Sequence, residues 1–198
     1  MEASTKLTDQ EKLALLEIAR TSIQSAVDGL ALPLIKKVSE TLRQPRGVFV
    51  TLRVNEELRG CIGYVEPLFP LAQATQDVAV KAAMEDPRFT PLSASEVDGI
   101  TIEISVLSPL EPLHDIEKIE IGKHGLVISA GYRRGLLLPQ VAVEYDWDCK
   151  QFLSHTAMKA GLPPDAWTRK EVQLFTFTVE KFDESYTRTL LTKDGNSG

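Results

Sequence analysis

The chain is organised around the six residues Leu58-Arg59-Gly60-Cys61-Ile62-Gly63. Residues 47–53 before them alternate in a way that predicts a β-strand, and the polar residues Asn55-Glu56-Glu57 predict a short turn. Residues 58–65 are then the returning strand of a hairpin, in which Arg59 and Cys61 share one face. Glycine weakens a strand and often marks a bulge or a close approach to the backbone. Two glycines around a thiol therefore mark this hairpin as a candidate site.

Outward from the hairpin, the hydrophobic spacing predicts further helices and strands. Thr8, with Glu11 three residues later, predicts a capped helix that Gly29 ends, and a second helical pattern follows Pro33. The expected elements after the hairpin are a helix over residues 71–85 and a strand over 100–107, on either side of the stop Asp86-Pro87.

The same order recurs in the second half of the chain. Residues 125–129 resemble residues 47–51, and Arg134-Gly135 takes the place of Arg59-Gly60, with Leu136 where Cys61 stands. A helix capped by Asp148 and a strand over residues 172–179 follow. We therefore expect an α+β fold of two lobes, built from internally duplicated hairpin–helix–strand units. The expected boundaries are a frayed N-terminus at 1–7, one domain at 8–186 (units about 47–107 and 125–180) and a flexible tail at 187–198.

Composition narrows the classes of function. The 198 residues are 43% hydrophobic and 25% charged, as in ordinary globular proteins, and no apolar run suggests a membrane span. The N-terminal residues do not form a secretory signal, and two distant cysteines do not predict a disulfide, so we expect a cytoplasmic protein. A net charge of −6 disfavours a broad nucleic-acid surface, although arginines near the hairpins leave a local basic patch open.

Several motifs, in order, resemble the AMMECR family, called AmmeMemoRadiSam system protein A in bacteria. The resemblance runs from about Leu13 to Phe182. It rests on residues 46–52 and 58–63, then on Asp86-Pro87-Arg88-Phe89, residues 104–108, His124-Gly125-Leu126 and residues 137–142. It implies a two-lobed, internally duplicated α+β fold. It also implies an uncharacterised accessory role beside a Memo-type protein and a radical S-adenosylmethionine enzyme, with the Arg-Gly-Cys motif as the candidate site.

Cys61 is the candidate nucleophile, because thiolate is the reactive form and a nearby cation stabilises it. Arg59 is the expected cation, and His124 is a candidate base if the two halves face each other. The alternative is a small thiol buried in a strand, which is common for free cysteine.

The remaining candidates are binding residues. Arg59 and Arg134 could grip an anion, or could be solvated hairpin residues. Asp86 could orient Arg88 back towards Cys61, or the segment could serve only as a helix stop. The candidate substrate- or partner-binding residues are Arg59, Gly60, Gly63, Arg88, Arg134 and Glu144. Glu144 and Glu103 are also conceivable general bases.

Neither a metal site nor a cofactor is expected. His114, His124, His155 and the two cysteines show no ligand spacing, and the chain has no phosphate-binding glycine loop. Three hypotheses stay open. The first is an accessory or binding component that works with a radical S-adenosylmethionine enzyme and a Memo-type protein through a cleft at the Arg59-Gly60-Cys61 motif. The others are a Cys61-dependent group-transfer or hydrolytic enzyme, and an RNA-modification factor, which the acidic charge disfavours.

Overall fold

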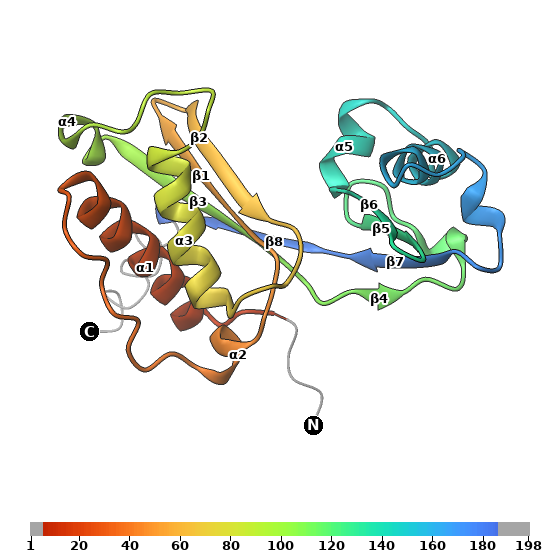
Figure 1. Cartoon of the computed structure of the whole chain (residues 1–198), viewed down its shortest axis with the longest axis horizontal. Helices are drawn as coiled ribbons and strands as arrows, with labels where there is room; N and C mark the ends of the chain where they lie inside the picture. The colour runs from red at the N-terminus through yellow and green to blue at the C-terminus, as the bar shows by residue number, and fades with distance from the viewer. Residues whose placement is uncertain (1–5, 186–198) are drawn as a thin grey trace, which may run out of the picture. The chain divides into compact units, whose positions relative to one another are not determined.

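A computed structural model describes residues 6–185, which fold as two compact units (Figure 1). Unit 1 lies within residues 1–106 and 180–198, and unit 2 holds residues 107–179. The α+β class expected from the sequence is confirmed, because each unit combines helices with an antiparallel sheet. The predicted fraying of residues 1–5 and the predicted tail at 187–198 lie outside the described residues.

Unit 1 is a four-stranded sheet with helices on one face (Figure 1). The strand order is β2-β1-β3-β8, and β1 runs antiparallel to both of its neighbours. Helices α1 and α3 lie side by side over the face on which Val50, Leu52 and Ile104 are fully buried. The elements of unit 1 are α1 (Asp9–Val27), α2 (Glu40–Arg43), β1 (Val48–Val54), β2 (Glu57–Tyr64), α3 (Leu71–Met84), α4 (Ala94–Val97), β3 (Ile100–Leu107) and β8 (Val179–Asp183).

Helix α1 begins where the capping pattern predicts. The Thr8 hydroxyl accepts from the Glu11 amide at 3.3 Å, and the Glu11 carboxylate accepts from the Thr8 amide at 2.8 Å. This box satisfies two amides that the helix itself leaves unpaired. Leu7, just before the cap, is already buried in the core, and its amide donates to Glu180 at 3.0 Å. Ordered structure therefore begins before the predicted start of the domain at Thr8.

The second helix expected after Pro33 is mostly absent. Helix α2 covers only Glu40–Arg43, and the segment before it is irregular, with Lys37 at a φ of 45°. The exposed fraction of Leu34 is 82%, whereas that of Leu42 is 1%. The periodic apolar residues therefore do not form one buried stripe, and a short helix capped by Ser39 replaces the expected long one.

The first hairpin forms as predicted but carries a bulge. Asn55 and Glu56 both have positive φ, which is the conformation of a two-residue type I′ turn. Leu52 pairs with Gly60 and Arg53 pairs with Leu58, so Arg59 is an extra residue on β2. The expected strict alternation is therefore wrong at Leu58, which is 39% exposed although Gly60 is buried.

Unit 2 repeats the order of hairpin, helix and strand. Its sheet has the order β4-β7-β5-β6, with β5 antiparallel to β6 and β7. This arrangement is what an internal duplication predicts, and the duplication itself stays a prediction. The elements of unit 2 are β4 (Glu111–Pro112), η1 (Ile116–Lys118), β5 (Gly125–Ala130), β6 (Arg133–Leu137), α5 (Pro139–Glu144), α6 (Cys149–Lys159), η2 (Ala166–Thr168) and β7 (Gln173–Phe177).

A glycine lets a helix approach each hairpin closely. A Cβ atom on Gly60 would lie 2.1 Å from the carbonyl oxygen of Ala82 on α3. A Cβ atom on Gly135 would lie 2.4 Å from the amide nitrogen of Ala160, where α6 ends. Both distances are shorter than any real contact, so the glycine of each Arg-Gly pair is required by packing.

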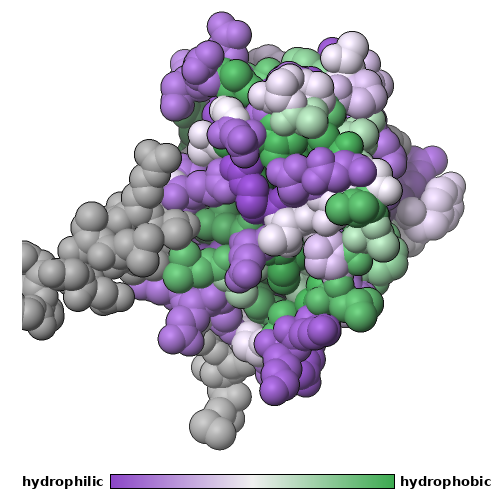
Figure 2. Space-filling view, turned by 90° about the vertical axis from the view of Figure 1, so that its left-hand side faces the viewer, coloured by the Kyte–Doolittle hydropathy of each residue, from purple (hydrophilic) through white to green (hydrophobic). Residues whose placement is uncertain are grey.

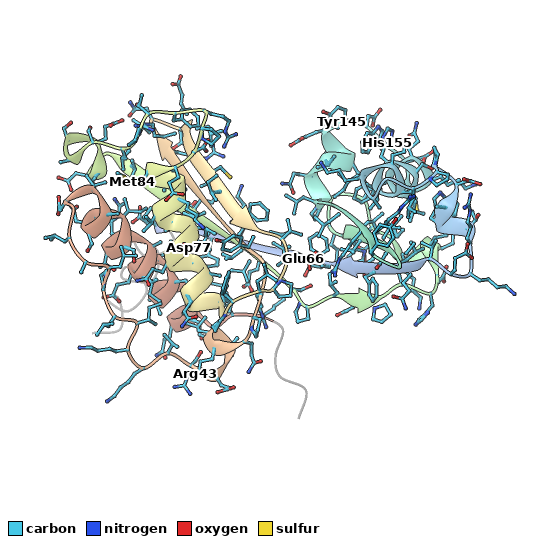
Figure 3. The ribbon with its side chains drawn as sticks, viewed as in Figure 1. Arg43, Glu66, Asp77, Met84, Tyr145 and His155 are labelled. Atoms are coloured by element: carbon cyan, nitrogen blue, oxygen red, sulfur yellow. The ribbon has the colours of Figure 1, made fainter. Side chains whose placement is uncertain are left out.

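The end of β2 is also tied to α3 by polar groups. The Lys81 ammonium donates to the Tyr64 hydroxyl at 2.6 Å and to Asp77 at 2.8 Å, and Tyr64 donates to Asp77. Figure 3 shows Asp77 on this helix. These bonds and the packing at Gly60 fix β2, which is an edge strand, against the helix.

The surface of unit 1 is mixed. Figure 2 shows hydrophobic residues gathered between hydrophilic ones on one side of the molecule. The most exposed large apolar side chains of unit 1 are Leu34, Leu68 and Leu30, at 82%, 68% and 66%. Within residues 6–185, no helix is long and apolar enough to cross a membrane.

Candidate functional site at Cys61

Cys61 lies in the middle of the edge strand β2, and its thiol is half-buried. Its partner on β1 is Thr51, which is 8% exposed. The Thr51 hydroxyl donates to Cys61 Sγ at 3.3 Å. The thiol therefore has a polar partner on the neighbouring strand.

The outer edge of β2 is capped at Cys61 by two side chains from the segment after α3. The Asp86 carboxylate accepts from the Cys61 amide at 2.8 Å, and Arg88 Nη2 donates to the Cys61 carbonyl at 3.1 Å. Together, they occupy the backbone groups that a further strand would use. Asp86-Pro87-Arg88-Phe89 is thus more than a helix stop, since the structure places Arg88 against Cys61.

Asp86 and Arg88 also hold each other. The carboxylate accepts from Arg88 Nε at 2.9 Å, from Nη2 at 2.7 Å and from the Arg88 amide at 3.1 Å. The guanidinium holds the pKa of Asp86 far below its usual range, and the amide of Cys61 lowers it further. The same ion pair raises the pKa of Arg88, with smaller contributions from the charge of the Cys61 side chain and a hydrogen bond to it. Asp86 is therefore ionised at neutral pH, and Arg88 lies close to the thiol.

Arg59 does not supply the cation expected for Cys61. Its guanidinium donates to both carboxylate oxygens of Glu96, at 2.9 Å and 3.4 Å, and to the carbonyl of Thr90 at 3.0 Å. This pairing lowers the pKa of Glu96 to about 2, chiefly through the hydrogen bonds from Arg59. Arg59 thus ties the bulge of β2 to the start of α4, and the cation beside Cys61 is Arg88.

Gly63 makes room for an aromatic ring. Phe49 is its cross-strand partner, and a Cβ atom on Gly63 would lie 2.2 Å from the ring. Gly60, as described above, makes room for α3. Both glycines of the motif are accounted for by packing, and neither needs a ligand to explain it.

Polar side chains continue from the thiol across the sheet. Thr51 pairs with Cys61 on one side and with Glu103 of β3 on the other. The Glu103 side chain is 15% exposed and is paired with Lys181 of β8 at 2.9 Å. Glu103, a conceivable base in the sequence, is therefore an ion-paired carboxylate one strand beyond Thr51.

The other candidate residues belong to unit 2. His124 precedes β5, and its Nδ1 accepts from the Glu120 amide at 3.1 Å. Arg134 is an exposed residue of β6, and Glu144 is exposed at the end of α5. The hydrogen bonds to Cys61 described above all come from residues of unit 1.

His155 in unit 2 is stacked on an aromatic ring. The rings of Trp147 and His155 lie parallel at 3.7 Å, and Tyr145 stacks on Trp147 at 5.0 Å. Figure 3 shows Tyr145 and His155 together at one end of unit 2. Across residues 6–185, no group of three or more His, Cys, Asp or Glu side chains could hold a metal ion.

Two members of the site were not recognised in the sequence. The sequence pattern places Thr51 within the strand over residues 47–53 and assigns no role to Glu96. The pairing of strands could have identified Thr51, because the register of a short hairpin fixes which residues lie opposite each other. Ser93 with Glu96 three residues later is a capping-box pattern that could have marked Glu96 as a helix-start residue, but no local signal predicts that its carboxylate also binds Arg59.

The residues around Cys61 define a class of site. It is a half-buried thiol on the capped edge of an antiparallel sheet, in an α+β protein, with a hydroxyl donor and a guanidinium beside it. The chain belongs to the AMMECR1 family, whose sequence profile matches residues 16–182.

Relatives from archaea match almost the whole chain. Protein MJ0810 of Methanocaldococcus jannaschii is 42% identical over 186 residues, which cover 90% of this chain and 92% of that protein. Protein MK0488 of Methanopyrus kandleri is 46% identical over 188 residues, covering 90% and 91%. The crystal structure of the uncharacterised protein PH0010 from Pyrococcus horikoshii is similar, with a TM-score of 0.72 at 39% identity, over 92% of this chain and 95% of that one.

Proposed function

We propose that this protein is a cytoplasmic accessory component that binds a partner protein through the Cys61 site. The partner that the resemblance suggests is a radical S-adenosylmethionine enzyme, acting together with a Memo-type protein. Cys61 and Arg88 form the contact surface on this chain.

The observation that carries the proposal is that the charged side chains of the site are fixed by ion pairs and hydrogen bonds to one another. Arg59 is bound to Glu96, and Asp86 is bound to both Arg88 and the Cys61 amide. Side chains fixed in advance lose little conformational entropy when a partner binds. The result is a rigid surface with a half-buried thiol at its centre, which suits recognition.

A catalytic role finds less support in the same geometry. A thiol nucleophile is usually activated by an adjacent base. The three histidines of the chain are His114, His124 and His155, and all three lie in unit 2. The carboxylate bonded to the Cys61 backbone is that of Asp86, which is ionised but committed to Arg88 and to backbone amides.

The test is co-purification of the protein with the radical S-adenosylmethionine enzyme and the Memo-type protein of the same organism. Cys61→Ala is expected to reduce the captured enzyme at least tenfold. Cys149→Ala is the matched control, because Cys149 is also half-buried but lies in unit 2. Equal capture by the wild-type protein and both variants would show that the Cys61 site is not the contact.

The second candidate function is Cys61-dependent group transfer. It is favoured by two contacts of Cys61: the Thr51 hydroxyl donates to Sγ at 3.3 Å, and the Arg88 guanidinium donates to the Cys61 carbonyl at 3.1 Å. Cys149 offers a contrast, because burial raises the pKa of its thiol. The expected result is alkylation of Cys61 by iodoacetamide at pH 7 at least ten times faster than alkylation of Cys149. Equally slow labelling of both cysteines would remove this candidate.

A further inference from the structure

The Arg88 guanidinium has one edge that is engaged and one that is open. Nε and Nη2 donate to the two oxygens of Asp86, and Nη2 also donates to the Cys61 carbonyl. Nη1 carries two further N–H groups, and within residues 6–185 the hydrogen bonds of Arg88 to oxygen use the backbone amide, Nε and Nη2 but not Nη1. The Arg88 side chain is 53% exposed, so these donors can be reached from solvent.

The open edge is held in a fixed position. The Asp86 side chain that binds the opposite edge is only 2% exposed. The Phe89 ring lies 5.5 Å from the Arg88 guanidinium carbon and supports it from a second side. Because two bonds to a buried carboxylate fix the plane of the fork, a ligand at Nη1 meets donors that are already oriented.

Arg59 shows what a fully used guanidinium looks like in the same unit. Its Nε and Nη2 donate to Glu96 and its Nη1 donates to Thr90. Its side chain is 15% exposed. The anion-binding role that the sequence suggested for Arg59 is therefore more suited to Arg88.

We propose that the Nη1 edge of Arg88 is an anion subsite, which holds a carboxylate or phosphate group next to the Cys61 thiol. The proposal rests on the function proposed above, because it assigns the chemistry of the group that the Cys61 site recognises. The N–H groups of Nη1 can donate charge-assisted hydrogen bonds to the oxygens of an oxyanion, and such bonds are about twice as strong as bonds between neutral groups. The anion belongs either to a small metabolite or to an acidic side chain of the partner, and the test separates these sources.

The probe is a pair of alkylating reagents, iodoacetate and iodoacetamide, which differ in charge. In both reactions the Cys61 thiolate forms the S–C bond, and iodide leaves with the electron pair of the C–I bond. The ratio of the two rate constants cancels any change in the fraction of thiolate. It therefore reports how strongly the surroundings of Cys61 favour a reagent with a carboxylate over a neutral reagent of similar size.

Arg88→Ala is expected to lower the iodoacetate-to-iodoacetamide ratio at Cys61 about tenfold. Arg88→Lys, which keeps a charge for Asp86 but has no second edge, is expected to lower it severalfold. Arg43→Ala removes an exposed guanidinium on α2 and is the matched control, with an unchanged ratio. An unchanged ratio in folded Arg88→Ala and Arg88→Lys proteins overturns the proposal.

Competition identifies the source of the anion. Slower reaction of wild-type Cys61 with iodoacetate in millimolar phosphate or acetate supports a small anion, and slowing only by the purified radical enzyme supports an acidic side chain.

The capture experiment with Cys61→Ala is read separately. If Arg88→Ala lowers the iodoacetate-to-iodoacetamide ratio but Cys61→Ala still captures the radical enzyme normally, the proposed function is overturned and the anion subsite is supported. If Arg88→Ala leaves the ratio unchanged but Cys61→Ala no longer captures the enzyme, only the anion subsite is overturned.

Discussion

Replacing Asp86 by asparagine should destabilise unit 1 by about 3 kcal/mol at pH 7. The carboxylate accepts four hydrogen bonds, from the Cys61 amide and from three N–H groups of Arg88, at 2.7–3.1 Å. The single amide oxygen of the Asp86→Asn variant can accept about two of them, so about two charge-assisted bonds are lost. Each is worth about 1.5 kcal/mol, the lower end of the range, because Arg88 is half exposed.

The loss should also depend on pH. The folded-state pKa of Asp86 is far below its usual value, so the carboxylate contributes its full stability above the unfolded pKa of about 4. That contribution falls as the pH drops towards the folded-state pKa. Since the asparagine variant does not titrate at this position, the difference in stability should shrink by about 1.4 kcal/mol per pH unit below about pH 4.

The assay for Asp86→Asn is urea unfolding followed by far-UV circular dichroism at pH 7 and at pH 3. Both tryptophans, Trp147 and Trp167, lie in unit 2, so their fluorescence records that unit in the same samples. Hydrogen exchange of the Cys61 amide gives a local measure, and it should be faster in the variant. A difference below 1 kcal/mol at pH 7, or one that is the same at both pH values, would refute the assigned role of Asp86.

Four further substitutions test the surrounding structure. Gly60→Ala should lower the free energy of unfolding in urea by about 2 kcal/mol or more, because its Cβ would lie 2.1 Å from a helix carbonyl. Gly99→Ala is the control: the nearest atom to its Cβ would be 3.4 Å away, so it should change the free energy of unfolding by less than about 0.5 kcal/mol. Arg59→Met should raise the pKa of Glu96 from about 2 towards about 4, measured by NMR titration of the carboxyl carbon. Leu34→Ser should change the unfolding free energy by less than about 0.5 kcal/mol, because this side chain is 82% exposed.

Local signals in the sequence predicted the elements well. The Thr8–Glu11 capping box and the alternation in residues 100–107 give α1 and β3 their correct limits, because neighbours along the chain decide them. The prediction of a helix after Pro33 is wrong for the opposite reason. Its apolar spacing resembles a helix, but Leu34 has no core to bury against, so the pattern carries no stabilisation.

The candidate site was predictable only in part. The importance of Cys61 and the glycines follows from strand chemistry, since glycine in a strand marks a close approach. The choice between Arg59 and Arg88 as the cation beside the thiol could not be made from the sequence. It depends on a bulge at Arg59 and on a loop that returns to β2, and both are set by tertiary contacts rather than by neighbouring residues.

The most direct test of the account is protection of Cys61 by the partner. Labelling by N-ethylmaleimide is followed by mass spectrometry, with and without the purified radical S-adenosylmethionine enzyme, and Cys149 serves as the internal reference. We expect the enzyme to slow labelling of Cys61 at least tenfold and to leave Cys149 unchanged. Labelling of Cys61 at the same rate in the presence of saturating enzyme would contradict the proposal that this site is where the partner binds.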